Sequence, residues 1–273
     1  MTESTAIARS THGPVTTERL VEDLRALGVR PGMTIMVHTG LSRIGWVCGG
    51  AHSVISALIT AIGPEGTLMM PAQSPSLSDP QHWENPPVPQ SWWPTIRASQ
   101  PPYDPALTPT YQCGIVAETF RHWPETQRST HPLLSLCARG ANAQELLKDQ
   151  PLDDPLGNQS PLAALENKGG FILMIGSGWE TCTALHLAER RAEPNGPTIQ
   201  EGAPMLINGQ RQWVPITLPL MDSARFVTIG AQLDGTPFMT HGHIGHAFSR
   251  FFPLRPASHI TETALRVTSR PPT

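Results

Sequence analysis

A histidine and a glutamate stand three residues apart at the end of the segment Thr181–Glu189, Thr-Cys-Thr-Ala-Leu-His-Leu-Ala-Glu. Thr181 or Thr183 can cap a helix, which would then carry His186 on its first or second turn. At this spacing His186 and Glu189 share a helix face and lie within reach of each other. A carboxylate beside an imidazole fixes its tautomer and stabilises its protonated form, as a general base requires. The same spacing is also typical of an exposed polar pair without a catalytic role, so the rest of the chain must decide.

A second candidate site is a loop of small residues that follows a strand-like run at 33–37. The loop consists of His38, Thr39, Gly40, Leu41 and Ser42. Backbone amides in such a loop can face a thioester oxygen or a phosphate. An ordinary turn at the end of a strand is the alternative interpretation.

Other catalytic and binding motifs are weak or missing from the sequence. The three histidines His241, His243 and His246 invite a metal site, but they lack a nearby carboxylate or cysteine, so we expect no metal. The nucleophile elbow Gly-x-Ser-x-Gly is missing, as are the Walker and dinucleotide glycine motifs. A serine hydrolase and a nucleotide-binding enzyme of these types are therefore not expected.

The hydrophobic pattern alternates between helix and strand periodicity from the start of the chain. Apolar residues predict helices at 17–27 and 51–62 and buried strands at 33–37 and 67–70. This alternation favours an α/β sheet with parallel neighbours. Further elements are expected as helices at 113–123, 141–148, 222–232 and 256–268, strands at 133–138 and 171–176, and a hairpin at 205–215 that turns at Asn208-Gly209.

The predicted fold is a three-layer α/β/α sheet with an antiparallel hairpin in a single domain. The domain is expected to span residues 16–268, between a flexible amino terminus at 1–15 and a flexible carboxyl terminus at 269–273. Residues 72–110 are rich in proline, show no periodicity and contain Trp83, Trp92 and Trp93. Because disordered segments are poor in aromatic residues, we expect this stretch to be an ordered flap over a cleft.

Composition excludes several classes of protein. The chain has 19 Lys and Arg against 22 Asp and Glu, so no basic surface for nucleic acid is expected. No stretch approaches 18 apolar residues and no signal peptide is evident, so no membrane span is expected. The four cysteines form no Cys-x-x-Cys pair, which is typical of reduced thiols in a cytoplasmic protein.

Four blocks of sequence together resemble the aminoglycoside 3-N-acetyltransferase family of antibiotic acetyltransferases. They occur in the family's order and cover roughly residues 16–266. The blocks are 37–45 with 49–50 and 63–71; 108–110 with 128–132 and Ser135; 183–189; and 242–250. None of the blocks is specific alone, and their common order carries the resemblance.

The resemblance implies a role for each candidate residue. It implies that His186 is the catalytic base with Glu189 as its partner. It implies that acetyl-CoA contacts His38, Thr39, Gly40, Leu41, Ser42, Thr108, Ser129 and His131. It implies that Asp79 and Asp222 receive the cationic substrate, and Glu84, Asp153 and Asp154 are weaker candidates.

The resulting hypothesis is an acetyl-CoA-dependent N-acetyltransferase that modifies the 3-amino group of a 2-deoxystreptamine aminoglycoside and confers antibiotic resistance. The transfer is expected to be direct, without a protein nucleophile. A related acyltransferase acting on a different amine and a non-catalytic drug-binding protein are the alternatives. The oligomeric state is left open, with a homodimer among the alternatives.

Overall fold

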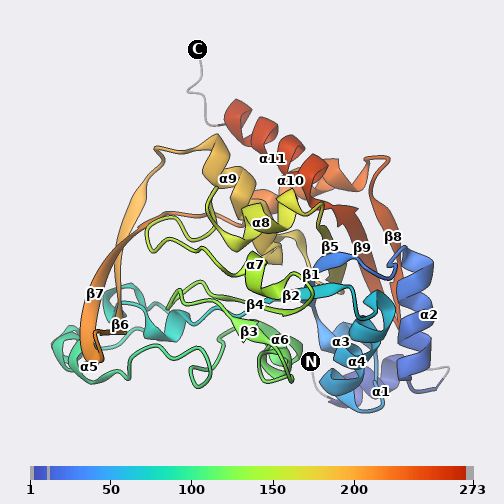
Figure 1. Ribbon diagram of the computed structural model, residues 1–273, viewed down its shortest axis with the longest axis horizontal. Helices are drawn as coiled ribbons and strands as arrows, with labels where there is room; N and C mark the ends of the chain where they lie inside the picture. Colours follow the sequence, from blue (N-terminus) through green and yellow to red (C-terminus); the bar gives the residue numbers. More distant parts are fainter. Residues whose placement is uncertain (1–2, 11–12, 269–273) are drawn as a thin grey trace.

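A mixed seven-stranded sheet forms the centre of the molecule (Figure 1). The structure is a computed structural model, and it describes residues 3–10 and 13–268. The strands lie in the order β3-β4-β2-β1-β5-β9-β8. Their bounds are β1 Thr34–Thr39, β2 Thr67–Pro71, β3 Gln127–Arg128, β4 Leu136–Gly140, β5 Phe171–Ile175, β8 Thr240–Ile244 and β9 Ala247–Pro253. The central strands β2, β1 and β5 are parallel, and every pairing outside them is antiparallel.

Helices cover both faces of this sheet, which confirms the predicted three-layer α/β/α architecture. One face is covered by α2 (Thr17–Leu27), α4 (Gly50–Ile62) and α6 (Gly114–Arg121). The other face is covered by α7 (Ala143–Leu146), α8 (Pro161–Asn167), α9 (His186–Ala192), α10 (Arg225–Asp234) and α11 (Leu254–Thr268). Among the described residues, no helix is long and apolar enough to cross a membrane.

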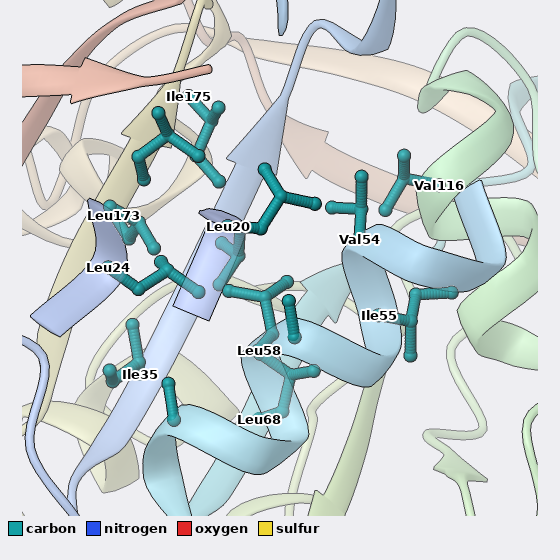
Figure 2. Close-up of a cluster of buried hydrophobic side chains, with 14 of the residues drawn as sticks. Leu20, Leu24, Ile35, Val54, Ile55, Leu58, Leu68, Val116, Leu173 and Ile175 are labelled. Atoms are coloured by element: carbon teal, nitrogen blue, oxygen red, sulfur yellow. The ribbon is translucent and has the colours of Figure 1, made fainter. Parts of the chain in front are cut away.

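The two hydrophobic cores follow from the alternation of side chains along the strands. In β1, Ile35 and Val37 point to the first face while Met36 points to the second. Figure 2 shows the first core, where Ile35 of β1 lies among side chains of α2 and α4. Thr16 caps the helix α2, since its hydroxyl accepts a hydrogen bond from the Arg19 amide.

The hairpin β8–β9 is an element that the sequence analysis did not predict. Residues 242–250 entered the prediction only as a block of the family resemblance, whereas Thr240–Ile244 pair with Ala247–Phe251. Gly245 closes the hairpin with a φ of +57°, and an added Cβ would lie 2.5 Å from the Ile44 carbonyl oxygen. The turn joins two strands that complete one edge of the sheet.

The amino-terminal residues differ from the predicted flexible segment. Residues Glu3–Arg9 form the helix α1, in which Ala6 is buried. The Ser10 hydroxyl donates to the Ala6 carbonyl and accepts from the Trp46 amide, at 3.1 and 2.8 Å. These bonds attach α1 to the domain that was expected to begin only at residue 16. The predicted flexible carboxyl terminus at 269–273 lies outside the described residues.

The proline-rich flap contains short helices and packs against a two-stranded ribbon. Its helices are η1 (Pro75–Leu77), η2 (Pro80–His82), η3 (Gln90–Trp92) and α5 (Trp93–Ser99). The ribbon consists of β6 (Thr198–Ile207) and β7 (Gln210–Pro219) and turns at Asn208-Gly209, as the sequence predicts. Figure 1 shows the ribbon extending away from the sheet towards α5. A third hydrophobic cluster joins flap and ribbon; its buried members are Leu77, Tyr103, Leu133, Ala203, Ile216 and Leu218.

Candidate active site

The histidine–glutamate pair lies at the start of α9, beyond the carboxyl end of β5. Nδ1 of His186 and Oε2 of Glu189 are 2.6 Å apart. Two short 3-10 turns, η4 (Trp179–Thr181) and η5 (Thr183–Leu185), lead from β5 to α9. The prediction that a threonine caps this helix is wrong, because α9 begins at His186 directly after η5 without a side-chain cap. The predicted spacing nevertheless brings the two side chains together on one face.

Glu189 is buried and held on both of its oxygens. Its Oε1 atom accepts a hydrogen bond from the Asp222 backbone amide at 3.0 Å, and a nitrogen of Arg225 lies 3.8 Å away. Burial alone would raise the pKa of Glu189, but the hydrogen bond from His186, the Asp222 amide and Arg225 together hold this pKa below its usual value. Glu189 is therefore a charged carboxylate that orients His186 through Nδ1 and leaves Nε2 without a contact to Glu189.

A cavity of about 400 Å³ surrounds the exposed edge of His186. Its lining also includes His38 and Thr39 at the end of β1, Cys113 before α6, and Glu180 in η4. Phe226 packs edge-on against the His186 ring, with centroids 4.9 Å apart, and so fixes the plane of the imidazole. Because one side chain of the cavity can accept a proton and several others can hydrogen bond, the cavity is suited to proton-coupled transfer chemistry.

The predicted loop 38–42 lies between this cavity and a second one of about 480 Å³. Thr39 and Gly114 line both cavities, while Gly40, Leu41 and Ser42 line the second. Gly40 allows the loop to approach the end of β5 closely, since an added Cβ would lie 2.8 Å from the Gly176 carbonyl oxygen. The structure thus brings the five predicted loop residues to the two cavities.

The other three residues assigned to the cofactor lie elsewhere and have structural partners. The Thr108 hydroxyl accepts from the Asp104 amide, and the Ser129 hydroxyl accepts from the Leu136 amide. His131 is buried; its Nδ1 accepts from two backbone amides and its Nε2 lies 3.2 Å from the Leu152 carbonyl oxygen. None of the three lines either cavity. Their polar atoms hold the chain together, and their contact with the cofactor stays a prediction.

Arg128, the neighbour of these residues, is the centre of that structural network. Its guanidinium donates to the Ala72 carbonyl and to the Ser74 hydroxyl, each at 2.5 Å, and to the Thr108 carbonyl. It also donates to the Ser135 hydroxyl at 3.0 Å. The second block of the family resemblance therefore joins the flap to β4 and the end of β2.

The two predicted substrate carboxylates are also outside the cavity lining. Asp79 is buried, forms an ion pair with Arg97 at 2.7 Å and caps η2 through the Gln81 amide. The Asp222 carboxylate accepts from the Ala224 amide at 3.0 Å, in the turn before α10. Of the weaker candidates, Asp154 pairs with Arg190 at 2.9 Å. Each of these carboxylates has a structural partner, which the sequence could not show.

Glu180 was not among the predicted site residues, and it is the one carboxylate among the described residues that line the cavity beside His186. It lies in η4, between β5 and α9. Cys113 also lines this cavity, and the cysteines were predicted only to be reduced thiols. Burial raises the pKa of the Cys113 thiol above its usual value, so the thiol stays protonated at neutral pH. Their positions just after β5 and just before α6 were the only signal for either residue.

His241 and His243 lie on β8, and His246 lies in the turn between β8 and β9. His241 pairs with Asp234 at 3.0 Å, and the His246 amide donates to the Ile44 carbonyl. His243 lies edge-on to Phe248. Over residues 3–10 and 13–268, no group of three or more His, Cys, Asp or Glu side chains is arranged to hold a metal ion.

Comparison with known proteins places this site in a family. A family model described as aminoglycoside 3-N-acetyltransferase matches residues 36–266. The SPbeta prophage-derived aminoglycoside N(3')-acetyltransferase-like protein YokD of Bacillus subtilis (strain 168) is 42% identical over 257 residues, which are 94% of this chain and 94% of YokD. Aminoglycoside N(3)-acetyltransferase VIII of Streptomyces fradiae is 43% identical over 203 residues, 74% of this chain and 70% of that enzyme.

Solved structures agree with this match. The crystal structure of YokD from Bacillus subtilis superposes with a TM-score of 0.94 at 39% identity, covering 98% of this chain and all 100% of that one. The binary complex of AAC-IIIb with CoASH superposes with a TM-score of 0.83 at 31% identity, covering 96% of this chain and 100% of AAC-IIIb. AAC-VIa bound to sisomicin superposes with a TM-score of 0.83 at 28% identity, covering 94% of this chain and 99% of AAC-VIa. The chain belongs to the aminoglycoside 3-N-acetyltransferase family, whose members are acyltransferases.

Proposed function

We propose that this protein transfers an acetyl group from acetyl-CoA to the 3-amino group of a 2-deoxystreptamine aminoglycoside, with His186 as general base. The observation that carries the proposal is the 2.6 Å contact between His186 and the buried Glu189 at the edge of a cavity. Relatives named aminoglycoside N(3)-acetyltransferases and a relative crystallised with CoASH support the donor and the acceptor.

The reaction follows from the protonation states of the pair. The lone pair of the neutral acceptor amine attacks the thioester carbonyl carbon, and the π electrons move to the carbonyl oxygen. Nε2 of His186 takes the proton that the amine loses, and Glu189 stabilises the resulting imidazolium. When the intermediate collapses, the C–S bond breaks and the CoA sulfur receives the proton from His186. The products are the N-acetylated amine and the free thiol of CoA.

Direct transfer fits the chemistry of the cavity better than an acylated protein. The only thiol among the described residues of the cavity lining is Cys113, whose raised pKa keeps it protonated. Its sulfur lies 3.5 Å from the Tyr111 carbonyl oxygen, to which it can donate. A protonated, hydrogen-bonded thiol is a poor nucleophile. A single attack by the amine is therefore the simpler path.

We place acetyl-CoA along the loop Thr39–Ser42 and the acceptor in the cavity beside His186. Thr39 and Gly114 border both cavities, so a thioester held at this border could reach an amine held near His186. The backbone of Gly114, with a φ of +81°, is free of a side chain at this border. Proximity of the two substrates would supply a large part of the rate enhancement.

Glu180 is the group that we propose receives one of the acceptor's ammonium groups. It is exposed and lines the same cavity as His186. A carboxylate at this position attracts a polycation towards the reacting end of the cavity. Acetylation of the drug's amine removes a positive charge, which supports a role in antibiotic resistance. Because the donor is an intracellular metabolite, we propose that the reaction takes place in the cytoplasm.

A related acyltransferase with a different amine acceptor is the second candidate. It is favoured by the presence of a single carboxylate, Glu180, among the described residues that line the cavity. A smaller amine with one positive charge would need only one carboxylate to bind it. The similarity to YokD, which is named an acetyltransferase-like protein, is consistent with either acceptor.

Thiol release from acetyl-CoA separates the candidates. The wild-type protein is assayed with a panel of aminoglycosides, with simple primary amines, and with no acceptor. Release that depends on a drug, together with a drug mass increased by one acetyl group, supports the first proposal. Release only with other amines supports the second. Drug binding without thiol release would instead identify a drug-binding protein.

A further inference from the structure

His38 occupies a central position next to the catalytic pair. It is the fifth residue of β1, in the middle of the sheet, and lies in register with Met174 of β5. The side chain lines the same cavity as His186, and the residue is only 4% exposed. A buried imidazole in a central strand, at the edge of a catalytic cavity, is not explained by packing alone.

The ring of His38 has an unsatisfied nitrogen. Its Nε2 atom is buried and has no hydrogen-bond partner among the described residues. Buried polar atoms in proteins are nearly always hydrogen bonded, and exceptions often have a catalytic or ligand-binding role. His131 illustrates the contrast, because both nitrogens of that buried ring have backbone partners. The unsatisfied Nε2 of His38 is therefore a polar atom that a group from a substrate could satisfy.

The environment keeps this ring neutral. Burial, and then the nearby charge of His186, lower the pKa of His38 to about 4. When His186 takes the proton of the amine, a second cation beside it would be unfavourable, so His38 stays uncharged throughout the cycle. A neutral imidazole is a hydrogen-bond donor at one nitrogen, and such rings can polarise a carbonyl without giving up their proton.

We propose that His38 is a second catalytic residue, whose Nε2–H donates a hydrogen bond to the carbonyl oxygen of the acetyl thioester. This role rests on the acyl transfer proposed above. As the amine attacks and the carbonyl π electrons move to oxygen, the growing negative charge is stabilised by the Nε2–H dipole. His38 keeps its proton in every step. The electrons return to the carbonyl when the C–S bond breaks, and His186 alone carries the transferred proton.

The position of His38 supports this division of roles. The adjacent Thr39 borders both cavities, at the place where we put the thioester. The His38 carbonyl lies 3.5 Å from the Ser177 hydroxyl, which ties the strand end to the turn after β5. The donor is thus carried by a central strand, and its geometry is set by the sheet rather than by a mobile loop.

Three variants of His38 test the proposal. His38→Leu removes both ring nitrogens and keeps an apolar side chain of similar size. His38→Gln places an amide N–H near the position of Nε2, whereas His38→Asn places one near Nδ1. Each variant is assayed for kcat and KM by thiol release, for acetyl-CoA affinity by calorimetry, and for thermal unfolding.

We expect His38→Leu to lower kcat by about 100-fold, the scale of one lost oxyanion donor, while acetyl-CoA affinity changes by less than about threefold. His38→Gln should recover at least about tenfold of this loss, and His38→Asn should not. Because His38 does not titrate near neutral pH, the acid limb of the pH–rate profile should persist at a lower plateau. Loss of the limb itself would point to a role in proton transfer instead.

The outcomes distinguish this inference from the proposed function. If wild-type protein releases no thiol with any amine, the acyl transfer itself is wrong. If wild-type protein is active and folded His38→Leu keeps its kcat, the role of His38 alone is wrong. Recovery by Asn and not by Gln would overturn the assignment to Nε2. Should His38→Leu fail to fold, a His38→Gln variant that is folded but as inactive as His186→Ala would also contradict the proposal.

Discussion

The backbone amide of Asp222 donates a hydrogen bond to Oε1 of Glu189, across 3.0 Å. This bond joins the segment before α10 to the His186–Glu189 pair on α9. The Asp222 carboxylate, which the family resemblance assigned to the substrate, accepts from the Ala224 amide. The contribution of Asp222 to the site is therefore made by its main chain, and a substitution of its side chain should leave the bond to Glu189 in place.

His186→Ala should lower kcat by about two orders of magnitude or more, because the amine loses its general base. The affinity for acetyl-CoA should be nearly unchanged, since the proposed mechanism places the His186 ring against the amine and not against the body of the cofactor. Steady-state thiol release and calorimetry measure the two effects. His259→Ala, an exposed histidine on α11, is the matched control and should keep the wild-type rate. A His186→Ala protein with wild-type turnover would exclude His186 from the mechanism.

Glu189→Gln should lower kcat by about tenfold or more but by less than His186→Ala, because Glu189 orients the imidazole without taking the proton. It should also lower stability in a pH-dependent way. The pKa of Glu189 is held below its usual value in the folded protein, so its stabilisation is complete above the unfolded-state pKa and is lost on acidification through the folded-state pKa. The difference in unfolding free energy between wild type and variant should therefore shrink as the pH falls through and below the usual carboxyl range. A difference that grows over this range in urea denaturation would contradict the shift.

Glu180→Gln should raise the Michaelis constant for an aminoglycoside several-fold and change kcat little. A contact made equally in the ground state and the transition state acts on binding, and an exposed ion pair is worth about 1 kcal/mol or less. The effect should diminish as ionic strength rises. Asp79→Asn is the control: its carboxylate is paired with Arg97 outside the cavity lining, so it should affect stability and leave the Michaelis constant unchanged. The reverse pattern would restore Asp79 as the substrate carboxylate.

Arg128→Met should destabilise the fold by about 3 kcal/mol or more, because the buried oxygens of Ala72, Ser74 and Thr108 lose their donor. Arg139 lies on β4, the strand next to Arg128, and forms an ion pair with Glu125 at 2.9 Å near the surface. Arg139→Ala should lower the free energy of unfolding by about 1 kcal/mol or less. Urea denaturation of both variants gives the comparison. Equal effects of the two substitutions would show that the Arg128 network contributes little.

Much of the fold was readable from the periodicity of the sequence. Helices α2 and α4 and strands β1, β2 and β5 carry clear apolar patterns, and each lies within a few residues of its predicted bounds. The hairpin β8–β9 was missed because the strand 247–253 mixes buried and exposed positions around Ser249 and Arg250. Local patterns also cannot reveal that a strand is antiparallel to its neighbour, because that depends on which distant segments meet. The sheet is therefore more antiparallel than the predicted alternation implied.

The site was predictable where its residues are close in sequence and not where they are brought together by the fold. His186 and Glu189 share a helix face, so their contact follows from spacing alone. Asp79 looks like any accessible carboxylate until its pairing with Arg97 is known, and the sequence separates those residues by a proline-rich stretch. The position of Glu180 at the cavity likewise depends on how β5 and α9 are joined in three dimensions.

The hydrophobic cluster between flap and ribbon has a consequence for how the protein unfolds. Its side chains, which include Leu77, Tyr103 and Ile216, are separate from the two cores that hold helices to the sheet. A separate cluster of this kind can open in a local fluctuation while the central sheet stays folded. Backbone amides of β6 and β7 should then exchange with deuterium well before those of β1 and β5. A protein built on this plan can vary the length and chemistry of flap and ribbon, and with them the molecules it admits, without rebuilding the strand and the helix that hold His38 and His186.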